Sequence, residues 1–247
     1  MTLTCFIKKS LLTVTALLVV STAVSQVTQG RIVFERRTNL KKRIGDNPRM
    51  KDFINDQNKI RKENFELFFN ESGSVFKYIE PDSPVEGGFL KYMTQRNTVY
   101  QNLEENEKLI IMDLWGSPAH LKDSIVKREW KVTESKRKFD GYLCRKAVWE
   151  MNDSTRIYAW FSPDIVPATG PEGFNGLPGT ILGLATEDGS VVYFATEVEV
   201  MEVKDEMLDY SGIKDDIYNK EELKALLSEK MGRWVKPKDL DAMFAWF

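Results

Sequence analysis

The sequence predicts a mainly β protein, built as a single curved or closed antiparallel sheet (half-barrel or sandwich-like) with one or two C-terminal helices. Short runs of β-branched and aromatic residues recur along most of the chain, with turn-forming Gly, Asn, Asp and Pro between them. Apolar residues recur at helical spacing only near the C-terminus. Hydrophobic residues make up 42% of the chain, which favours a packed core over disorder.

Residues 1–25 have the pattern of a cleavable secretory signal peptide. Lys8 and Lys9 precede an apolar stretch over 11–20, and small residues follow at Ala23 and Ser25. A membrane anchor would need about 20 apolar residues, and no cysteine directly follows the stretch to carry a lipid. We therefore expect an exported protein, periplasmic or outer-membrane-associated, with no stable membrane span after cleavage.

The remaining residues, 26–247, suit a single β-rich domain, and two small domains are the alternative. Their formal charge is −4, because the chain carries −2 and Lys8 and Lys9 leave with the signal. A chain without net positive charge has no overall field to hold nucleic acid. Nucleic acid is therefore not expected as a partner.

Cys144 and His120 are the only cysteine and histidine after the signal, which limits the chemistry available. No internal disulfide can form, so we expect Cys144 to be buried and inert, with a bond between chains as the alternative. A serine triad would have to use His120, and the chain has no Gly-x-Ser-x-Gly elbow. Zinc sites with more than two His or Cys ligands are excluded, while metals with oxygen ligands stay open.

The predicted elements follow one another as an antiparallel meander. Residues 31–36 form the first strand, 40–60 form a polar excursion with a short helix, and 65–79 form a hairpin. Further strands are expected at 98–103, 109–114, 124–126, 130–133, 143–150, 156–161, 179–185 and 190–203. A helix capped by Asn219 is expected over 220–230, and a second helix over 238–246. Because both faces of 142–150 carry apolar residues, a sandwich, a barrel and a curved sheet with helices in its concavity all stay open.

The most distinctive stretch is rich in glycine and proline and covers residues 170–182. It reads Gly-Pro-Glu-Gly-Phe-Asn-Gly-Leu-Pro-Gly-Thr-Ile-Leu and follows a strand that contains Trp160. Upstream, Tyr142, Cys144, Lys146 and Ala147 form a tyrosine-x-cysteine-x-lysine-alanine strand. Together these residues resemble the GLPGLI family of small exported proteins from Gram-negative bacteria. The match spans 141–194, with looser agreement at 30–35 and 65–79.

The resemblance implies export and a β-rich fold but no reaction, because the family as a whole has no assigned activity. Thr180 departs from the family name, which has leucine there. We expect a structural role for the residues that match the family: Cys144, Lys146, Trp160, Gly170, Pro171, Gly176, Leu177, Pro178 and Gly179.

A type II turn over 177–180 accounts for the proline-glycine pair in this stretch. Pro178 pre-sets the first central residue, and Gly179 accepts the positive φ of the second. The alternative is an anion-binding concavity made by backbone amides near Gly173, Gly176 and Gly179. That alternative is disfavoured, because no basic anchor or helix start follows.

Residues 197–206 form the densest acidic stretch, and Glu197 and Glu199 share one strand face. These two are weak candidates for metal ligands or acid–base groups, although acidic residues on a strand are usually solvated and protect an edge. We predict no catalytic residue and no cofactor. Most of the tryptophans are expected in the core, and the apolar residues 243–247 are expected to dock onto the domain.

The predicted function is an exported, non-enzymatic binding or accessory protein of the cell envelope. Its partner would be an apolar small molecule or an outer-membrane protein. The succession of long antiparallel strands is similar to half-barrel lipid carriers of the periplasm, which favours the apolar ligand, although fold does not fix function. The alternatives are a carboxylate-dependent hydrolase and a structural envelope component.

Overall fold

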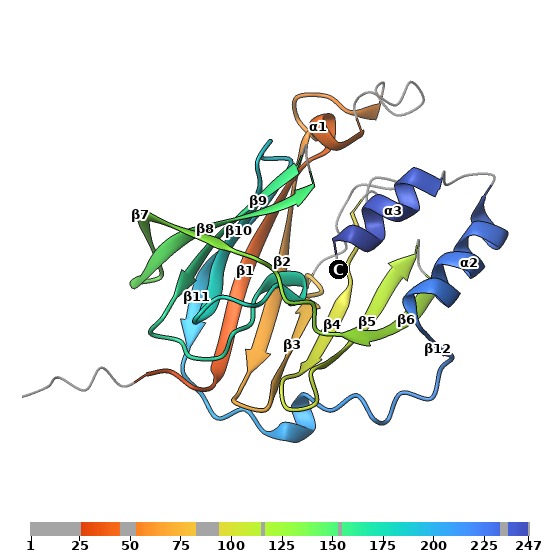
Figure 1. The fold of residues 1–247 in the computed structure, drawn as a ribbon. Coiled ribbons are helices and arrows are strands. Elements are labelled where there is room, and N and C mark those ends of the chain that lie inside the picture. Colours follow the sequence, from red (N-terminus) through yellow and green to blue (C-terminus); the bar gives the residue numbers. More distant parts are fainter. Residues whose placement is uncertain are drawn as a thin grey trace, which may run out of the picture.

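The computed structural model describes residues 26–44, 53–82, 94–114, 117–152, 155–232 and 237–246. Their strands form one 12-stranded sheet with the order β12-β6-β5-β4-β3-β2-β1-β11-β10-β9-β8-β7. Figure 1 shows that this sheet is strongly curved and open, with helices at one side. The predicted fold class is confirmed, and of the two predicted forms the sheet takes the curved one.

Two antiparallel meanders contain eleven of the twelve strands. The first contains β1 (Gly30–Asn39), β2 (Ile60–Phe69), β3 (Gly73–Tyr78), β4 (Thr98–Asn102), β5 (Glu107–Leu114) and β6 (Ser117–Ser124). The second contains β7 (Lys131–Phe139), β8 (Tyr142–Asn152), β9 (Thr155–Ser162), β10 (Thr180–Thr186) and β11 (Val191–Glu199). The meanders join where β1 pairs with β11, with Arg31 opposite Glu199.

The predicted hairpin over 65–79 is confirmed as β2 and β3. Asn70 shapes its turn, because its side-chain oxygen accepts hydrogen bonds from the backbone N–H groups of Ser72 and Gly73. Phe68 lies opposite Val75 and Leu67 opposite Phe76. Large apolar pairs therefore stabilise both faces of the hairpin.

Among the described residues, three α-helices lie outside the sheet: α1 (Leu40–Ile44), α2 (Lys220–Met231) and α3 (Pro237–Ala245). Asn219 caps α2 as predicted, through a capping box in which Asn219 and Glu222 each accept from the other's backbone N–H. Leu223 of α2 and Phe244 of α3 are buried in the main core. In Figure 1 both helices lie beside β4, β5 and β6. The short β12 (Ile217–Tyr218) precedes α2 and pairs with β6 in parallel, the exception in an otherwise antiparallel sheet.

Some predicted boundaries are wrong. The strand predicted at 124–126 is β6, Ser117–Ser124, and the strand predicted at 130–133 continues to Phe139. The strand predicted at 190–203 ends at Glu199, the last residue paired with β1. The signal peptide at 1–25 lies outside the described residues, so its prediction stands as an expectation.

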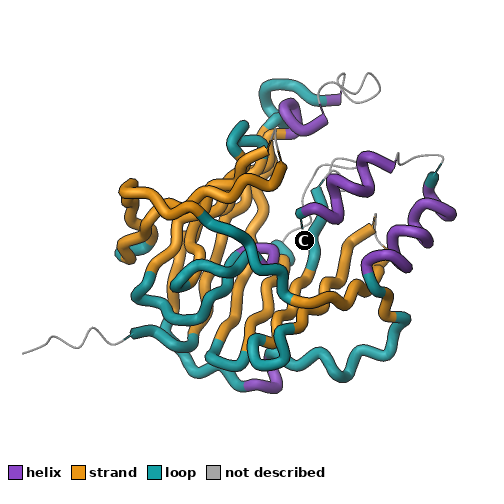
Figure 2. Tube along the Cα trace, viewed as in Figure 1, coloured by secondary structure: helices purple, strands orange, loops and turns teal. Residues whose placement is uncertain are grey.

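The core lies on the concave face of the sheet. Alternate residues of β1, from Ile32 through Phe34 and Arg36 to Thr38, are buried, whereas their neighbours are less so. A smaller cluster covers part of the other face, where Phe68 and Val75 pack against Val203 and Leu208. Two loop segments cross the front of the curved sheet in Figure 2, so the chain covers its own concavity.

Candidate functional site

The first of these loops is the glycine-rich segment, defined here as residues 170–179. It begins with a 3-10 turn over Pro171–Gly173, in which Glu172 has a left-handed φ of 54°. A non-glycine residue in this region costs about 1–3 kcal/mol, so surrounding contacts must hold it. Glu172 is only 4% exposed, and its carboxylate points into the concave face.

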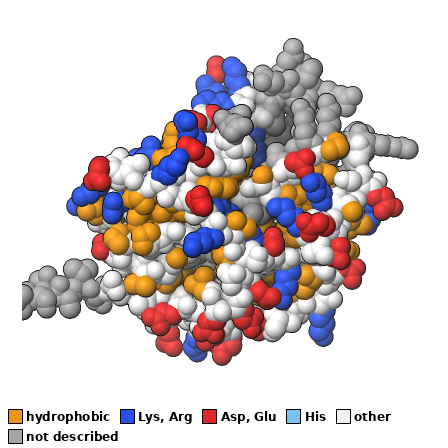
Figure 3. Space-filling view, viewed as in Figure 1, with side chains coloured by type: hydrophobic (Ala, Val, Ile, Leu, Met, Phe, Trp, Pro, Cys, Tyr) orange, Lys and Arg blue, Asp and Glu red, His pale blue; other side chains and the backbone are white. Residues whose placement is uncertain are grey.

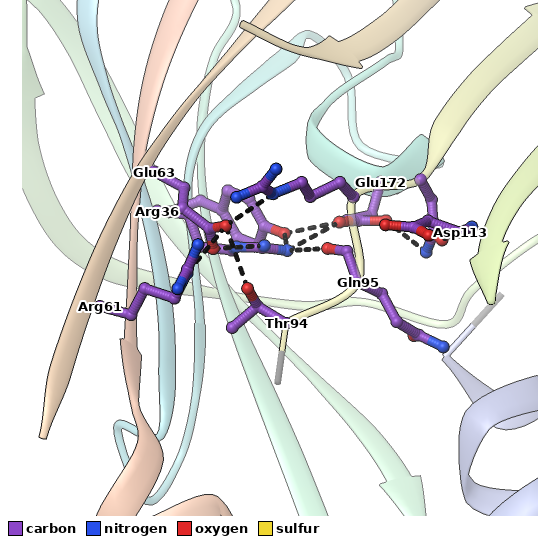
Figure 4. Close-up of polar contacts among 10 residues, drawn as sticks. Arg36, Arg61, Glu63, Thr94, Gln95, Asp113 and Glu172 are labelled. Carbon is purple, nitrogen blue, oxygen red and sulfur yellow. Dashed lines mark hydrogen bonds and ion pairs between the residues drawn. The ribbon is translucent and has the colours of Figure 1, made fainter. Parts of the chain in front are cut away.

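Glu172 reaches an arginine on β1 there, as Figure 4 shows. The guanidinium of Arg36 lies 3.6 Å from one Glu172 oxygen. Arg36 also donates to the Gln95 carbonyl at 2.7 Å and to Glu63 at 2.7 Å. Tyr193 of β11 donates its hydroxyl proton to Glu172 at 2.6 Å. We call these four side chains, Arg36, Glu63, Glu172 and Tyr193, the buried charge cluster.

The two carboxylates of this cluster have opposite pKa shifts. For Glu172, burial raises the pKa, and attraction to Arg36 opposes this only in part. For Glu63, burial is again the largest influence and acts in the same direction. Attraction to Arg36 and Arg61 and the hydrogen bonds from Arg36 and Thr94 together outweigh it, so the pKa of Glu63 is lowered. Glu63 accepts further hydrogen bonds from Thr94 and Arg96, both at 3.0 Å.

Polar side chains on β3 and β4 hold the next part of the segment. Gln101 donates to the carbonyl oxygen of Gly173 at 3.1 Å and accepts from Thr169 at 2.9 Å. Ser74 lies 2.8 Å from the Thr169 hydroxyl. All three side chains are at most 2% exposed, so each buried polar group has a partner.

Aromatic side chains enclose the middle of the segment. Phe174 is fully buried, and its ring lies 5.0 Å from the Trp246 ring and 6.1 Å from the Trp149 ring. The second loop crossing the concave face, residues 125–130, connects β6 to β7. We call it the crossover. Its Trp130 donates to the Asn175 carbonyl at 2.8 Å, and the Arg128 guanidinium lies 4.3 Å from the centre of the Phe174 ring.

The end of the segment differs from the predicted type II turn. Gly179 has the predicted positive φ, at 134°, but its N–H donates to Leu177, and the N–H of Thr180 donates to Ile165 instead. A Cβ at Gly179 would lie 2.1 Å from the Ser162 carbonyl oxygen. Close backbone approach therefore requires glycine here. The N–H groups of Gly173 and Gly179 are both used within the chain, which disfavours the anion-binding alternative.

The other residues on which the GLPGLI resemblance rests lie on β8 and β9. Cys144 is fully buried and free, and burial, with a contribution from Asp164, raises the pKa of its thiol to about 12. The Lys146 ammonium lies 3.8 Å from the centre of the Tyr158 ring and 5.7 Å from that of Trp160. His120 is on β6, and eight strands lie between β6 and β8 in the sheet order, so the strand order gives no support to a cysteine–histidine pair.

The predicted carboxylate pair lies away from the cluster. Glu197 and Glu199 are exposed on β11, with Arg31 at 4.0 and 3.9 Å. Within the described ranges, no group of three or more His, Cys, Asp and Glu side chains could hold a metal ion.

Sequence reasoning missed the buried charge cluster. Arg36 occupies a position of the same strand face as Ile32 and Phe34, and Glu63 shares its face with Phe65. Charged residues in such an alternation are a usable signal of a buried ion pair. Chemically, the cluster fixes the glycine-rich segment. Its side chains are nearly inaccessible to a substrate, since the Glu63 and Glu172 side chains are 2% and 3% exposed.

Two surface hollows are lined by described residues. One groove of about 550 Å³ is lined by β12 and α2, including Tyr218 and Leu226. A second, of about 210 Å³, lies beside the β2–β3 turn at Asn70. Neither lies within the concave face. No helix of the described part of the chain has the length and apolar character needed to cross a membrane.

One family model and two solved structures are similar to parts of this chain. A family model described as "Protein of unknown function (Porph_ging)" matches residues 149–183, which include the Trp160 strand and the whole glycine-rich segment. No curated protein matches.

Two solved structures of PNGF-II have a similar fold. The structure in the P21 space group is 18% identical, with a TM-score of 0.50 over 78% of this chain and 31% of that chain. The C2 structure is 19% identical, with a TM-score of 0.53 over 84% and 34%. The chain therefore spans about a third of the length of these relatives. The likeness concerns the fold alone, and the family match concerns one stretch of a family whose function is unknown.

Proposed function

We propose that this chain is an exported, non-enzymatic accessory protein of the cell envelope, of the GLPGLI type, that acts by binding another protein. The observation that carries the proposal is the occupied concave face. The glycine-rich segment and the crossover lie where a carrier of this shape would hold its ligand, and Phe174 is fully buried there. The occupied concave face disfavours an apolar small molecule as the ligand. Of the two kinds of partner expected from the sequence, we therefore propose a protein.

The polar groups also support a non-enzymatic role. Catalytic acids must reach a substrate, yet Glu63 and Glu172 are buried against Arg36 and Tyr193. The same contacts attach the glycine-rich segment to β1 and β11, which gives the cluster a structural role. Because the chain's own loops cover the concave face, the surfaces left for binding are the edges of the sheet and its outer face.

A carboxylate-dependent hydrolase is the second candidate, and one observation favours it. The raised pKa of Glu172 and the lowered pKa of Glu63 resemble the division into acid and base found in glycosidases. The pair Glu63 and Glu172 thus replaces Glu197 and Glu199 as the site to test. Its burial is the argument against it.

Native mass spectrometry of the protein purified from the envelope fraction of its host tests the proposal. A stoichiometric protein partner is the expected result. A monomer that is repeatedly empty would contradict it, and a co-purifying lipid would favour a carrier instead. For the hydrolase, a substrate screen should include Glu172→Gln and, as a matched control, Glu197→Gln: turnover lost only in Glu172→Gln would establish the second candidate.

A further inference from the structure

The β7–β8 hairpin differs in charge from the rest of the molecule. Between residues 136 and 146 it carries five basic side chains and one acidic side chain, whereas the whole chain has a net charge of −2. The one acidic group within 136–146, Asp140, accepts a hydrogen bond from the backbone N–H of Val198 at 2.7 Å, whereas Glu134 and Glu150 lie further along the two strands. Figure 3 shows acidic side chains gathered along the lower rim of the molecule, away from this hairpin. The tip of the hairpin is therefore a basic region on a chain of net negative charge.

One face of the hairpin gathers three of the cations around an apolar residue. Lys136 lies opposite Arg145 and Lys138 opposite Leu143, so all four project on the same side. Each of the four is exposed, and Leu143 is 43% exposed. We call these residues, Lys136, Lys138, Leu143 and Arg145, the basic hairpin face.

The positive charges of the basic hairpin face repel one another. Like charges directly opposite on neighbouring strands destabilise a sheet, and Lys136 and Arg145 form such a pair. The ion pair found on this hairpin joins Lys131 to Glu150 at 3.1 Å and leaves the three cations of the face outside it. An anionic partner would relieve their repulsion.

The hairpin is held firmly from its other side. Phe139 is 8% exposed, and its ring packs so closely on Gly183 that a Cβ there would lie 2.8 Å from the Phe139 ring. Together with the bond from Val198 to Asp140, this contact fixes the tip of the hairpin against β10 and β11. A fixed face loses little conformational entropy on binding.

β7 also offers backbone groups. It is the last strand in the sheet order, and among the described residues no strand pairs with its outer edge. The opposite end of the sheet differs, because β12 pairs with β6 there and α2 follows it. Regular pairing with β8 extends over Lys136 to Phe139, so the outer edge is extended beside the basic hairpin face.

We propose that β7 binds an extended, acidic polypeptide segment of a partner protein, added to the sheet as a further strand. Backbone hydrogen bonds at the free edge would supply affinity, and carboxylates facing Lys136, Lys138 and Arg145 would supply selectivity. Lysines on an edge strand usually prevent pairing between copies, and here they repel the same edge of a second molecule. They accept an acidic strand. This inference rests on the proposed accessory function and names the partner's chemistry.

Binding can be measured on the purified full chain with a synthetic peptide, Glu-Val-Glu-Thr-Glu-Val-Glu-Thr, by fluorescence anisotropy. The variant Lys136→Glu/Lys138→Glu/Arg145→Glu should bind at least about tenfold more weakly. The matched control, Lys127→Glu/Lys204→Glu/Lys214→Glu, makes the same change in charge at exposed positions elsewhere and should bind as the wild type does. Equal binding by all three proteins would overturn the proposal. Because all substituted residues are exposed, unchanged circular dichroism should accompany each variant.

Two further probes separate strand addition from other anion binding. Peptides N-methylated at every Glu, or at every Val and Thr, keep their charge but lose the N–H groups of one edge, so one of the two should lose binding. If both bind fully, strand addition is wrong. Binding to phosphatidylglycerol vesicles without binding to the peptide would assign the face to a membrane surface and also overturn the proposal. A partner found in the host despite such results would leave the proposed accessory function intact.

Discussion

Replacing Gly179 by alanine should destabilise the protein much more than replacing another glycine of positive φ. The new Cβ would lie 2.1 Å from the Ser162 carbonyl oxygen and 2.9 Å from the Pro163 Cα, both backbone atoms. The φ of 134° adds strain of about 1–3 kcal/mol. Forcing the two backbone segments apart costs about 1–3 kcal/mol more. We expect a loss of about 2–6 kcal/mol in total.

Gly141 provides the matched control, because it has a φ of 83° and nothing within 4 Å of its added Cβ. Gly141→Ala should cost only the backbone strain, about 1–2 kcal/mol. For a chain of this size the melting temperature falls by about 2–4 °C per kcal/mol. Thermal unfolding followed by circular dichroism should therefore separate the variants clearly. Equal melting temperatures would refute the argument that the contact with Ser162, rather than φ, requires glycine at 179.

Three further predictions concern buried groups. Arg36→Met should cost about 3–5 kcal/mol in urea unfolding, because it leaves Glu63 and Glu172 buried without their main counter-charge; a loss below about 1 kcal/mol would contradict this. Burial raises the pKa of Glu172, so its contribution is complete below the unfolded pKa of about 4.5 and is lost as the pH rises through the native pKa. The wild type should therefore lose stability relative to Glu172→Gln as the pH rises. Relative to Glu63→Gln it should gain stability, because the native pKa of Glu63 is lowered. A change in the same direction against both variants would be inconsistent with the cluster. Cys144, with a pKa raised to about 12, should not react with a thiol reagent at pH 8 until denaturant is added; rapid labelling of the folded protein would show that the thiol is accessible.

Local chemistry made much of the fold predictable. The hairpin at 65–79 has turn residues between two β-prone runs, and α2 begins at a capping box. β6 was misplaced because its first residues, Ser117 to His120, have little β propensity. They pair with β5 nonetheless, and Leu121 is buried in the core. Tertiary pairing outweighs propensity there.

The candidate site was less predictable. Arg36 and Glu63 could have been found from their positions among apolar residues of alternating strands. Glu172 could not, because its contact with Arg36 depends on the curvature of the sheet and on a loop more than a hundred residues away in sequence. The same holds for the crossover, whose Trp130 meets Asn175 because the chain crosses from β6, next to one end of the sheet order, to β7 at the other end.

The joint between the two meanders has a consequence for how this chain folds. Each meander contains mostly pairs of neighbouring strands, which form quickly because little chain must be closed into a loop. The pairing of β1 with β11 joins segments from nearly opposite ends of the described chain. That step is slow by comparison and must await synthesis of β11. Until then β1 has an open edge on the side where β11 will pair, so newly made molecules pass through a period in which this edge can aggregate or be engaged by a chaperone.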